Sequence, residues 1–391
     1  MILSRLRKPG RRQLGSCLVL AALLLSGCSI FMDKASGTKP KLPAKLLEFK
    51  QTEIIKVRWH QNIGSTSGNA LQPAVADDAV YAANVKGEVF RFERTTGKQV
   101  WRIESGFNIT GGIGFGEGLI LVGSSKGDLA AFEETGKLRW KVKVSSEVLG
   151  VPRVANGLVV VRTGDGRIAG LSALDGKRQW LYERTTPALI VRSHGGVIIS
   201  HGVVFAGFAA GRLAAIDLKN GAILWESAVS QPHGNTELER ISDITSTPVL
   251  DEDQVCAVAF QGRVACFDLK RGSLLWSRDM SSDQGMALQG KYLYVTDSNS
   301  VITALDKSSG SSLWKNEQLS LRSVSAPFVA GNHVVVGDYE GYLHVLGAED
   351  GSFAVRMRAD GSAVLTAPVE LEGGLLVQTA DGGLYSLSIK D

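Results

Sequence analysis

The sequence has few cysteines and no long apolar run, and both shortages narrow the classes of protein that it can encode. Only four of its 391 residues are cysteine. None of them forms a C-x-x-C pair, so zinc and thioredoxin-like redox sites with that spacing are excluded. The apolar stretch at residues 16–25 is about half as long as a bilayer-spanning helix, and it therefore predicts a signal-peptide core rather than a membrane span.

Motifs of common catalytic and metal sites are missing as well. There is no HExxH, no Asp-x-Asp-x-Asp-Gly loop and no GxSxG, and the six histidines show no ligand spacing. The glycine-rich segment 112–118 departs from GxGxxG because Glu117 stands where the last glycine should be. We therefore expect no catalytic residues, no metal and no cofactor.

The N-terminus carries the pattern of a bacterial lipoprotein. Five basic residues and no acidic one precede the apolar stretch: Arg5, Arg7, Lys8, Arg11 and Arg12. The stretch leads into Leu25-Ser26-Gly27-Cys28, a lipobox in which the cysteine sulfur takes a diacylglycerol. We predict a signal peptide at 1–27 and lipidation at Cys28. An ordinary signal peptide that happens to contain a cysteine is the alternative.

The residues after the lipobox predict where the mature chain is placed. Ser29, rather than Asp, follows the cysteine, and in bacterial lipoproteins this implies sorting to the outer membrane, facing the periplasm. Residues 28–50, with repeated Lys, two Pro and Gly37, predict a lipidated tether. Removing the leader lowers the 43 basic residues to 38, against 39 acidic residues, so the mature net charge is about −1. Nucleic acid is therefore not an expected partner.

The rest of the chain repeats one unit, marked by a glycine followed four residues later by tryptophan. The copies are Gly97/Trp101, Gly136/Trp140, Gly176/Trp180, Gly221/Trp225, Gly272/Trp276 and Gly310/Trp314. A seventh copy, Gly351, has Val355 in the tryptophan position. Each unit contains four short strand-like segments, A to D, and a spacing near 40 residues is typical of β-propeller blades. The tryptophans are expected to pack against the neighbouring blade, with an aromatic ligand cage as the alternative.

Turns between strands B and C set the number of blades at eight. They contain Gly87, Gly127, Gly166, Gly211, Gly262, Asn299, Gly341 and Gly382. The last unit lacks a fourth strand, whereas residues 54–60, with Trp59, form an unmatched strand at the N-terminal end. We predict an all-β fold over residues 51–391, an eight-bladed propeller of four-stranded antiparallel blades in which the N-terminal strand closes the ring. An open solenoid is the alternative.

Cys256 and Cys266 lie on two strands joined near Gly262. A three-residue connection, 260–262, makes the two cysteines face each other, whereas a two-residue connection points them to opposite faces. Export permits a disulfide, but a bridge across one hairpin closes a short loop. We expect two reduced, buried thiols.

Two of the glycine spacings, 45 and 51 residues, are longer than the others. The extra residues follow Trp180 and Trp225, in connections from a D strand to the next A strand. Such connections emerge on the same face as the B–C turns, so the two insertions are expected side by side on one rim. Apolar residues beside Arg and Asp are typical of a protein interface. Alternatively, the apolar residues belong to the A strands and the charges only cap the rim.

The chain resembles the BamB lipoprotein family of the outer-membrane β-barrel assembly machinery. The resemblance is sharpest at residues 235–243 and 340–344 and covers the mature chain. It implies an eight-bladed scaffold that binds the POTRA domains of BamA within the Bam complex. It also implies a role in outer-membrane protein assembly and insertion, with unfolded outer-membrane proteins as further candidate partners.

The resemblance also implies which residues contact BamA. A Leu-x-Leu-Arg run of the family is matched by Leu189, Val191 and Arg192, and an Asp-x-Asp patch is matched by Asp243. The second acidic position holds Thr245. We expect Arg192 and Asp243 to lie close together on the rim, with Leu189 and Val191 supplying apolar area.

A non-enzymatic scaffold anchored in the membrane by its lipid is therefore the predicted function. One alternative is a periplasmic quinoprotein-like oxidoreductase, because quinoprotein dehydrogenase blades also end in Gly-x-x-x-Trp. The vicinal disulfide and calcium site of those enzymes are not visible in this sequence, and a shared fold does not carry function. A propeller that binds a ligand in its central channel is the other alternative.

Overall fold

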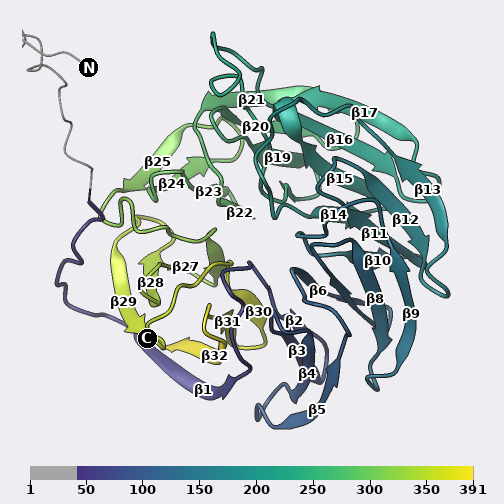
Figure 1. Ribbon diagram of the computed structural model, residues 1–391. Coiled ribbons are helices and arrows are strands. Elements are labelled where there is room, and N and C mark those ends of the chain that lie inside the picture. The colour runs from purple at the N-terminus through teal and green to yellow at the C-terminus, as the bar shows by residue number, and fades with distance from the viewer. Residues whose placement is uncertain (1–41, 391) are drawn as a thin grey trace, which may run out of the picture. The chain divides into compact units, whose positions relative to one another are not determined.

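Eight four-stranded antiparallel sheets follow one another around a ring in the computed structural model, which describes residues 42–390 (Figure 1). The predicted eight-bladed β-propeller is confirmed. The predicted signal peptide, residues 1–27, and the predicted lipidation site, Cys28, lie outside the described residues. The only helix in the described range is the short 3-10 turn η1 (Ala209–Gly211), so no helix there is long and apolar enough to cross a membrane.

Each blade runs from an inner to an outer strand, which we call A to D. Blade 1 contains β2 (Ala74–Val75), β3 (Ala79–Ala83), β4 (Glu88–Glu93) and β5 (Gln99–Glu104). Blade 2 contains β6 (Gly111–Gly116), β7 (Leu119–Gly123), β8 (Asp128–Glu133) and β9 (Leu138–Lys143). Blade 3 contains β10 (Arg153–Ala155), β11 (Leu158–Arg162), β12 (Ile168–Ser172) and β13 (Arg178–Tyr182). Blade 4 contains β14 (Val197–Ser200), β15 (Val203–Phe208), β16 (Arg212–Asp217) and β17 (Ile223–Ala228).

The second half of the ring repeats this order. Blade 5 contains β18 (Val249–Leu250), β19 (Gln254–Val258), β20 (Arg263–Asp268) and β21 (Leu274–Asp279). Blade 6 contains β22 (Gly285–Gln289), β23 (Tyr292–Thr296), β24 (Ile302–Asp306) and β25 (Ser312–Asn316). Blade 7 contains β26 (Phe328–Ala330), β27 (His333–Gly337), β28 (Tyr342–Gly347) and β29 (Phe353–Arg358). Blade 8 contains β30 (Val369–Leu371), β31 (Gly374–Gln378), β32 (Gly383–Lys390) and β1 (Ile54–Asn62).

The N-terminal strand closes the ring, as the sequence predicts. β1 pairs antiparallel with β32 from Ile54 opposite Lys390 to Asn62 opposite Gly383. The first strand of the ring thus completes the last blade, and Figure 1 shows the purple and yellow ends of the chain joined in one sheet. Without β1, blade 8 would have only three strands and the edge of β32 would be unpaired.

Apolar side chains pack mainly between blades rather than within them. Among the described residues, every pair of neighbouring blades shares one buried cluster, such as Leu121 and Trp140 of blade 2 with Val159 and Leu171 of blade 3. B strands such as β7 and β19 are therefore buried along their whole length, because both of their faces meet a neighbouring blade.

The repeated tryptophans link each blade to the next. Every indole N–H donates to a main-chain carbonyl of the following blade, as Trp140 does to Ala173 at 2.9 Å and Trp59 does to Arg94 at 2.9 Å. Each ring also covers the turn glycine of that blade. A Cβ added to Gly176, which has a φ of +73°, would lie 2.8 Å from Trp140. The expected structural role of the tryptophans is confirmed, and the Gly-x-x-x-Trp spacing follows from it.

Val355 interrupts the tryptophan series for a topological reason. It lies on the D strand of blade 7 and faces blade 8, where it is buried. In blade 8 strands C and D are β32 and β1, the two ends of the propeller, so no C–D turn exists there. A tryptophan at position 355 would have no turn glycine to cover.

Cys256 and Cys266 form a disulfide, so the expectation of two reduced thiols is wrong. The three-residue connection is the correct alternative, because Ala259 donates its main-chain N–H to Arg263 at 2.9 Å. This register places the two cysteines directly opposite each other with a Cα separation of 4.1 Å. Both side chains thus leave the sheet on the same face, close enough to be bridged.

The residues just before β1 run along the outside of blade 7, beside β29 (Figure 1). Ala44 donates its N–H to Ser320 at 2.9 Å, Thr52 donates to Ala354 at 2.9 Å, and the Phe49 ring stacks on Phe353. The final residues of the predicted tether, from Ala44 onward, therefore contact the propeller.

A buried chain of charged groups lies behind this segment. Asp338 accepts from Arg322 at 2.8 Å and from His344 at 3.0 Å, and His344 accepts from Arg356 at 3.1 Å. Arg356 then donates to the Leu47 carbonyl at 3.0 Å. Burial lowers the pKa of His344 below its ordinary value. Burial would raise the pKa of Asp338, but its hydrogen bonds with His344, Tyr342 and Arg322 hold that pKa low.

Candidate functional site

The two insertions lie beside each other and are bonded together. The first, residues 183–196, connects blade 3 to blade 4, and the second, residues 229–248, connects blade 4 to blade 5. Ser193 Oγ donates to the Thr245 carbonyl at 2.8 Å, and the Gly196 N–H donates to Thr247 Oγ1 at 2.9 Å. The sequence placed these segments on one rim correctly, and the structure adds that they form one hydrogen-bonded unit.

Asp243 is the residue that joins this unit to the blades beneath it. One carboxylate oxygen accepts from the Val191 N–H at 2.7 Å, and the other accepts from the Ala210 N–H at 2.9 Å. Its own main-chain carbonyl accepts from Phe260 at 2.8 Å. Asp243 is buried, with 4% of its surface exposed. It holds the first insertion to the B–C turns of blades 4 and 5, and we call this its latch role.

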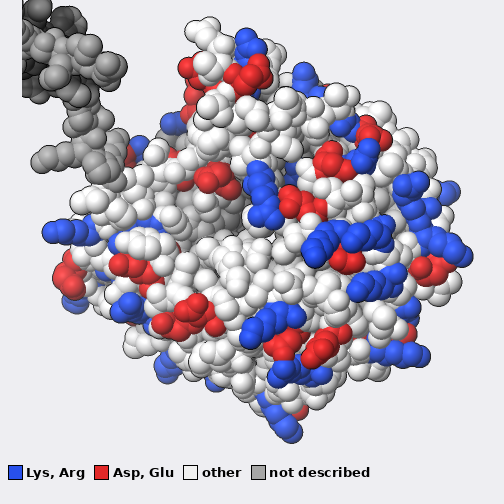
Figure 2. All heavy atoms as spheres, in the orientation of Figure 1, with Lys and Arg blue, Asp and Glu red and all other residues white. Residues whose placement is uncertain are grey.

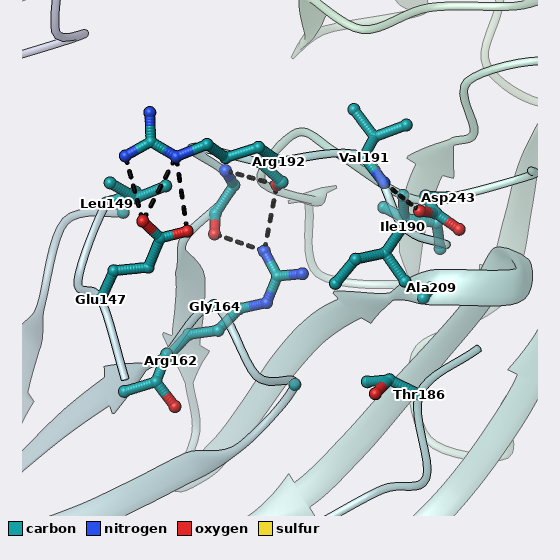
Figure 3. A pocket seen from close by; sticks show the side chains of 16 residues that line it. Glu147, Leu149, Arg162, Gly164, Thr186, Ile190, Val191, Arg192, Ala209 and Asp243 are labelled. Atoms are coloured by element: carbon teal, nitrogen blue, oxygen red, sulfur yellow. Dashed lines mark hydrogen bonds and ion pairs between the residues drawn. The ribbon is translucent and has the colours of Figure 1, made fainter. Parts of the chain in front are cut away.

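Arg192 and Asp243 line the same cavity but do not pair with each other. Arg192 instead forms an ion pair of 3.0 Å with Glu147, which comes from the connection between blades 2 and 3 (Figure 3). The Arg192 side chain remains 58% exposed, so its charge is available at the surface. The site therefore draws on three successive connections, from blade 2 to blade 5.

Exposed apolar side chains flank the charged groups. Leu189 and Ile190 are 46% and 39% exposed, and Val191 is half-buried. Leu238, at the tip of the second insertion, is 67% exposed. Large apolar side chains that protrude singly are common on protein surfaces, but these lie on two segments that the fold holds together.

The tip that carries Leu238 is internally ordered. The Glu239 carboxylate accepts from the main-chain N–H groups of Asn235 at 2.7 Å and Thr236 at 3.1 Å. Thr236 Oγ1 in turn accepts from the Glu239 N–H at 3.2 Å, which is the reciprocal pattern of a capping box. The bond from Asn235 is the largest cause of the lowered pKa of Glu239. Local hydrogen bonds thus hold Leu238 outward.

Arg162, at the end of β11, forms the floor of the cavity, whose volume is about 190 Å³. Its Nη1 donates to the Gly195 carbonyl at 2.7 Å and to Ser193 Oγ at 3.2 Å. Burial lowers the pKa of Arg162 to about 10, against the opposing charge of Asp243. The side chain thus supports the first insertion from below and remains charged at neutral pH.

The sequence alone did not predict Glu147 and Arg162 as residues of this site. Glu147 lies in a connection of ordinary length, and Arg162 is an isolated polar residue at the end of the apolar strand segment 158–162. Neither position departs from the repeat in spacing. An arginine ending an apolar B strand is the one signal that could have marked Arg162.

Thr245, at the family's second acidic position, is buried and does not replace the missing charge. Its Oγ1 has no hydrogen-bond partner among the described residues. Its carbonyl, however, accepts the bond from Ser193. The position therefore contributes main-chain bonding between the two insertions.

Both signs of charge occur side by side around the face that Figure 2 shows. Exposed ion pairs occur on the described surface, such as Arg184 with Glu226 at 3.1 Å. No cluster of three or more potential metal ligands is found among residues 42–390. Among the described residues, the rim therefore presents paired charges and apolar side chains.

The comparisons with known proteins agree with this architecture. The family model described as "Outer membrane protein assembly factor BamB" matches residues 85–316 and 317–391. A protein of that name from Nitrosomonas eutropha is 40% identical over 402 residues, covering 100% of this chain and 98% of the relative. The Escherichia coli protein of that name is 32% identical over 385 residues, covering 95% and 97%.

Solved structures show the same fold. The crystal structure of BamB from Moraxella catarrhalis has a TM-score of 0.80 at 26% identity and covers 86% of this chain and 100% of its own. The quinohemoprotein alcohol dehydrogenase from Comamonas testosteroni has a TM-score of 0.70 at 15% identity, covering 85% of this chain and 76% of its own. The dehydrogenase shares the fold alone.

The blades and their tryptophan contacts define the class, an eight-bladed β-propeller of the type that quinoproteins also use. Within that class, family model and full-length relatives agree. The chain belongs to the BamB family of outer membrane protein assembly factors.

Proposed function

We propose that this assembly factor is a scaffold that binds the POTRA domains of BamA, within the Bam complex, through the rim built by residues 183–196 and 229–248. The observation that carries the proposal is the bonding of these two longest connections into one unit. A preformed unit loses little conformational entropy when a partner binds, which favours a recognition role.

The side chains of this surface suit a protein partner. Leu189 and Ile190 offer apolar area, and Arg192 offers a charge that is only partly neutralised by Glu147. A few residues, with arginine prominent among them, supply most of the energy of protein interfaces, and the apolar contacts around them exclude water. In this proposal Leu189, Val191 and Arg192 contact BamA, whereas Asp243 acts by positioning them.

The scaffold acts by binding and performs no turnover. The charged groups of the rim serve the loops: Asp243 accepts main-chain N–H groups and Arg162 holds main-chain and hydroxyl oxygens. By holding BamA at its rim, the propeller also brings unfolded outer-membrane proteins, its further candidate partners, near the site of assembly.

The scaffold is anchored in the outer membrane through a lipid on Cys28 and faces the periplasm. The support is the lipobox at residues 25–28 and the serine that follows it. An extended chain spans about 3.3 Å per residue, so the 15 or so residues between Cys28 and Ala44 reach roughly 50 Å. This length keeps the propeller close to a membrane-bound partner.

Affinity for BamA, measured with the purified full-length lipoprotein in detergent, tests the proposal. Arg192→Ala should weaken binding roughly thirtyfold, the loss expected for an interface hot spot, without lowering the melting temperature. Arg102 is a matched control, since it is 53% exposed and paired with Glu88 on blade 1. Arg102→Ala should bind as the wild type does. Equal affinities of all three proteins, or no binding by the wild type, would contradict the proposal.

A further inference from the structure

Arg162 has more hydrogen-bond donors than the protein around it uses. A guanidinium carries five N–H donors, and in Arg162 both recorded bonds come from Nη1. Nε is buried without a partner among the described residues, and no bond from Nη2 is found within that range either. A buried donor without a partner is costly, which applies to Nε, and the two N–H groups of Nη2 are also free to meet a further acceptor.

The neighbouring carboxylates do not supply that acceptor. Glu147 receives the Arg192 guanidinium, and Asp243 receives the N–H groups of Val191 and Ala210. Asp243 therefore acts on Arg162 only as a nearby charge, without a direct bond. All of the recorded bonds of Arg162 go to uncharged oxygens.

The free side of the guanidinium faces the cavity. In Figure 3 its unbonded terminal nitrogen points toward the space beside Ile190, away from the bonds to the first insertion. The cavity of about 190 Å³ also has Leu149 and Val191 in its lining. Apolar side chains beside a cationic floor suit a short side chain that ends in a negative group, although Glu147, Arg192 and Asp243 also line the cavity.

We infer that the Arg162 cavity receives the carboxylate of an aspartate or glutamate side chain presented by the protein that docks on this rim. The inference deepens the proposed function, on which it rests, by naming the chemistry of the partner. A carboxylate is planar and matches the N–H fork of arginine. Its single charge also suits a cavity that Glu147 and Asp243 already line, whereas a phosphate dianion would be repelled more strongly by them.

The test combines two variants with two measurements. Arg162→Gln removes the charge while keeping a donor for the Gly195 carbonyl, and Arg162→Lys keeps the charge but loses the fork. The first measurement is the affinity of each full-length protein for BamA at several salt concentrations. We expect Arg162→Gln to weaken binding roughly tenfold or more and to flatten its salt dependence, and Arg162→Lys to recover part of the loss.

The second measurement uses a free probe and needs no BamA. Propionate, a short monocarboxylate, compared with sodium chloride at equal ionic strength, should raise the melting temperature of the wild type and leave Arg162→Gln unchanged. Inorganic phosphate should give the smaller shift, and an equal shift would overturn the choice of a carboxylate. If Arg162→Gln melts early, Arg162→Lys takes its place in both measurements. It should then bind BamA more weakly than the wild type and show a smaller shift in melting temperature with the free carboxylate.

The two proposals fail in different ways. If Arg162→Gln binds BamA like the wild type while Arg192→Ala does not, the cavity inference is wrong and the proposed function stands. If the wild type fails to bind BamA, the proposed function is wrong, and the propionate shift alone then decides for or against a carboxylate site at Arg162.

Discussion

The carboxylate of Asp243 accepts a hydrogen bond of 2.7 Å from the main-chain N–H of Val191, a residue 52 positions earlier in the chain. Its second oxygen accepts from Ala210. Since hydrogen bonds to charged groups contribute about 1.5–3 kcal/mol each, Asp243→Ala should lower the free energy of unfolding by about 2 kcal/mol or more. Chemical denaturation measures this loss, and amide exchange should quicken in residues 186–196.

Asp243→Asn is the matched variant, because it keeps one acceptor oxygen and should lose less stability than Asp243→Ala. Arg192→Ala should leave stability nearly unchanged, since an exposed ion pair contributes under about 1 kcal/mol. If Asp243→Ala unfolds like the wild type and its first insertion exchanges no faster, the latch role is refuted.

The N-terminal strand allows a test of ring closure by truncation. Deletion through His60 removes most of β1 and with it Trp59, whose ring covers Gly97 of blade 1. Blade 8 then keeps three strands, and the edge of β32 that β1 covers is unpaired. The thermal unfolding transition should therefore move to lower temperature and broaden. Deletion only through Pro43 should leave the melting curve unchanged, because the contacts with blades 6 and 7 begin at Ala44. Identical curves for the two truncations would mean that β1 does not close the ring.

The disulfide between Cys256 and Cys266 predicts a thiol count. Under denaturing, non-reducing conditions this pair should contribute no free thiol. A bridge that closes a loop of this length stabilises by about 2–3 kcal/mol in the chain-entropy model. The double variant Cys256→Ala/Cys266→Ala should therefore unfold at lower denaturant concentration. Two reactive thiols in the wild type would show that the pair is reduced.

The buried His344 is expected to make the free energy of unfolding depend on pH. Burial places its pKa in the folded protein below the ordinary value of 6.5, so the unfolded chain takes up a proton first as the pH falls. The stabilisation is therefore complete above about pH 6.5 and is lost as the pH falls from there through the folded pKa. The charged groups that face the ring are Asp338, Arg322 and Arg356.

Urea unfolding from about pH 7.5 to about pH 5.5 measures this effect. The wild type should lose more stability over this interval than His344→Gln, whose side chain does not titrate. The variant should be the less stable protein at the upper pH, because Gln cannot satisfy Asp338 and Arg356 in the same geometry. Parallel pH profiles would show that His344 does not titrate on unfolding.

The proposed lipid anchor depends on one sulfur atom, that of Cys28. Cys28→Ala should release the protein from the membrane or leave the signal peptide uncleaved, because the acyl chains supply the membrane affinity. Membrane fractionation and labelling with a fatty-acid analogue measure both outcomes, and Ser29→Ala serves as a control that keeps the sulfur. Unchanged retention and labelling of Cys28→Ala would contradict lipidation at this residue.

Regular spacing is what the sequence by itself determined. Gly-x-x-x-Trp recurs because each tryptophan must cover the glycine of the next blade, so a contact between blades appears as a local motif. The blade count, the closing strand and the position of the two insertions follow from that period. These features could be predicted because each repeat solves the same packing problem.

Only the tertiary structure decided which residues of the rim bond to one another. Asp243 bonds Val191 and Ala210, and Arg192 bonds Glu147, across 33 to 52 residues of sequence. The disulfide likewise depended on one residue of turn length, which fixes whether Cys256 and Cys266 share a face. Such contacts occur once rather than in every repeat, so no period records them, and they depend on where the closed ring brings separate connections together.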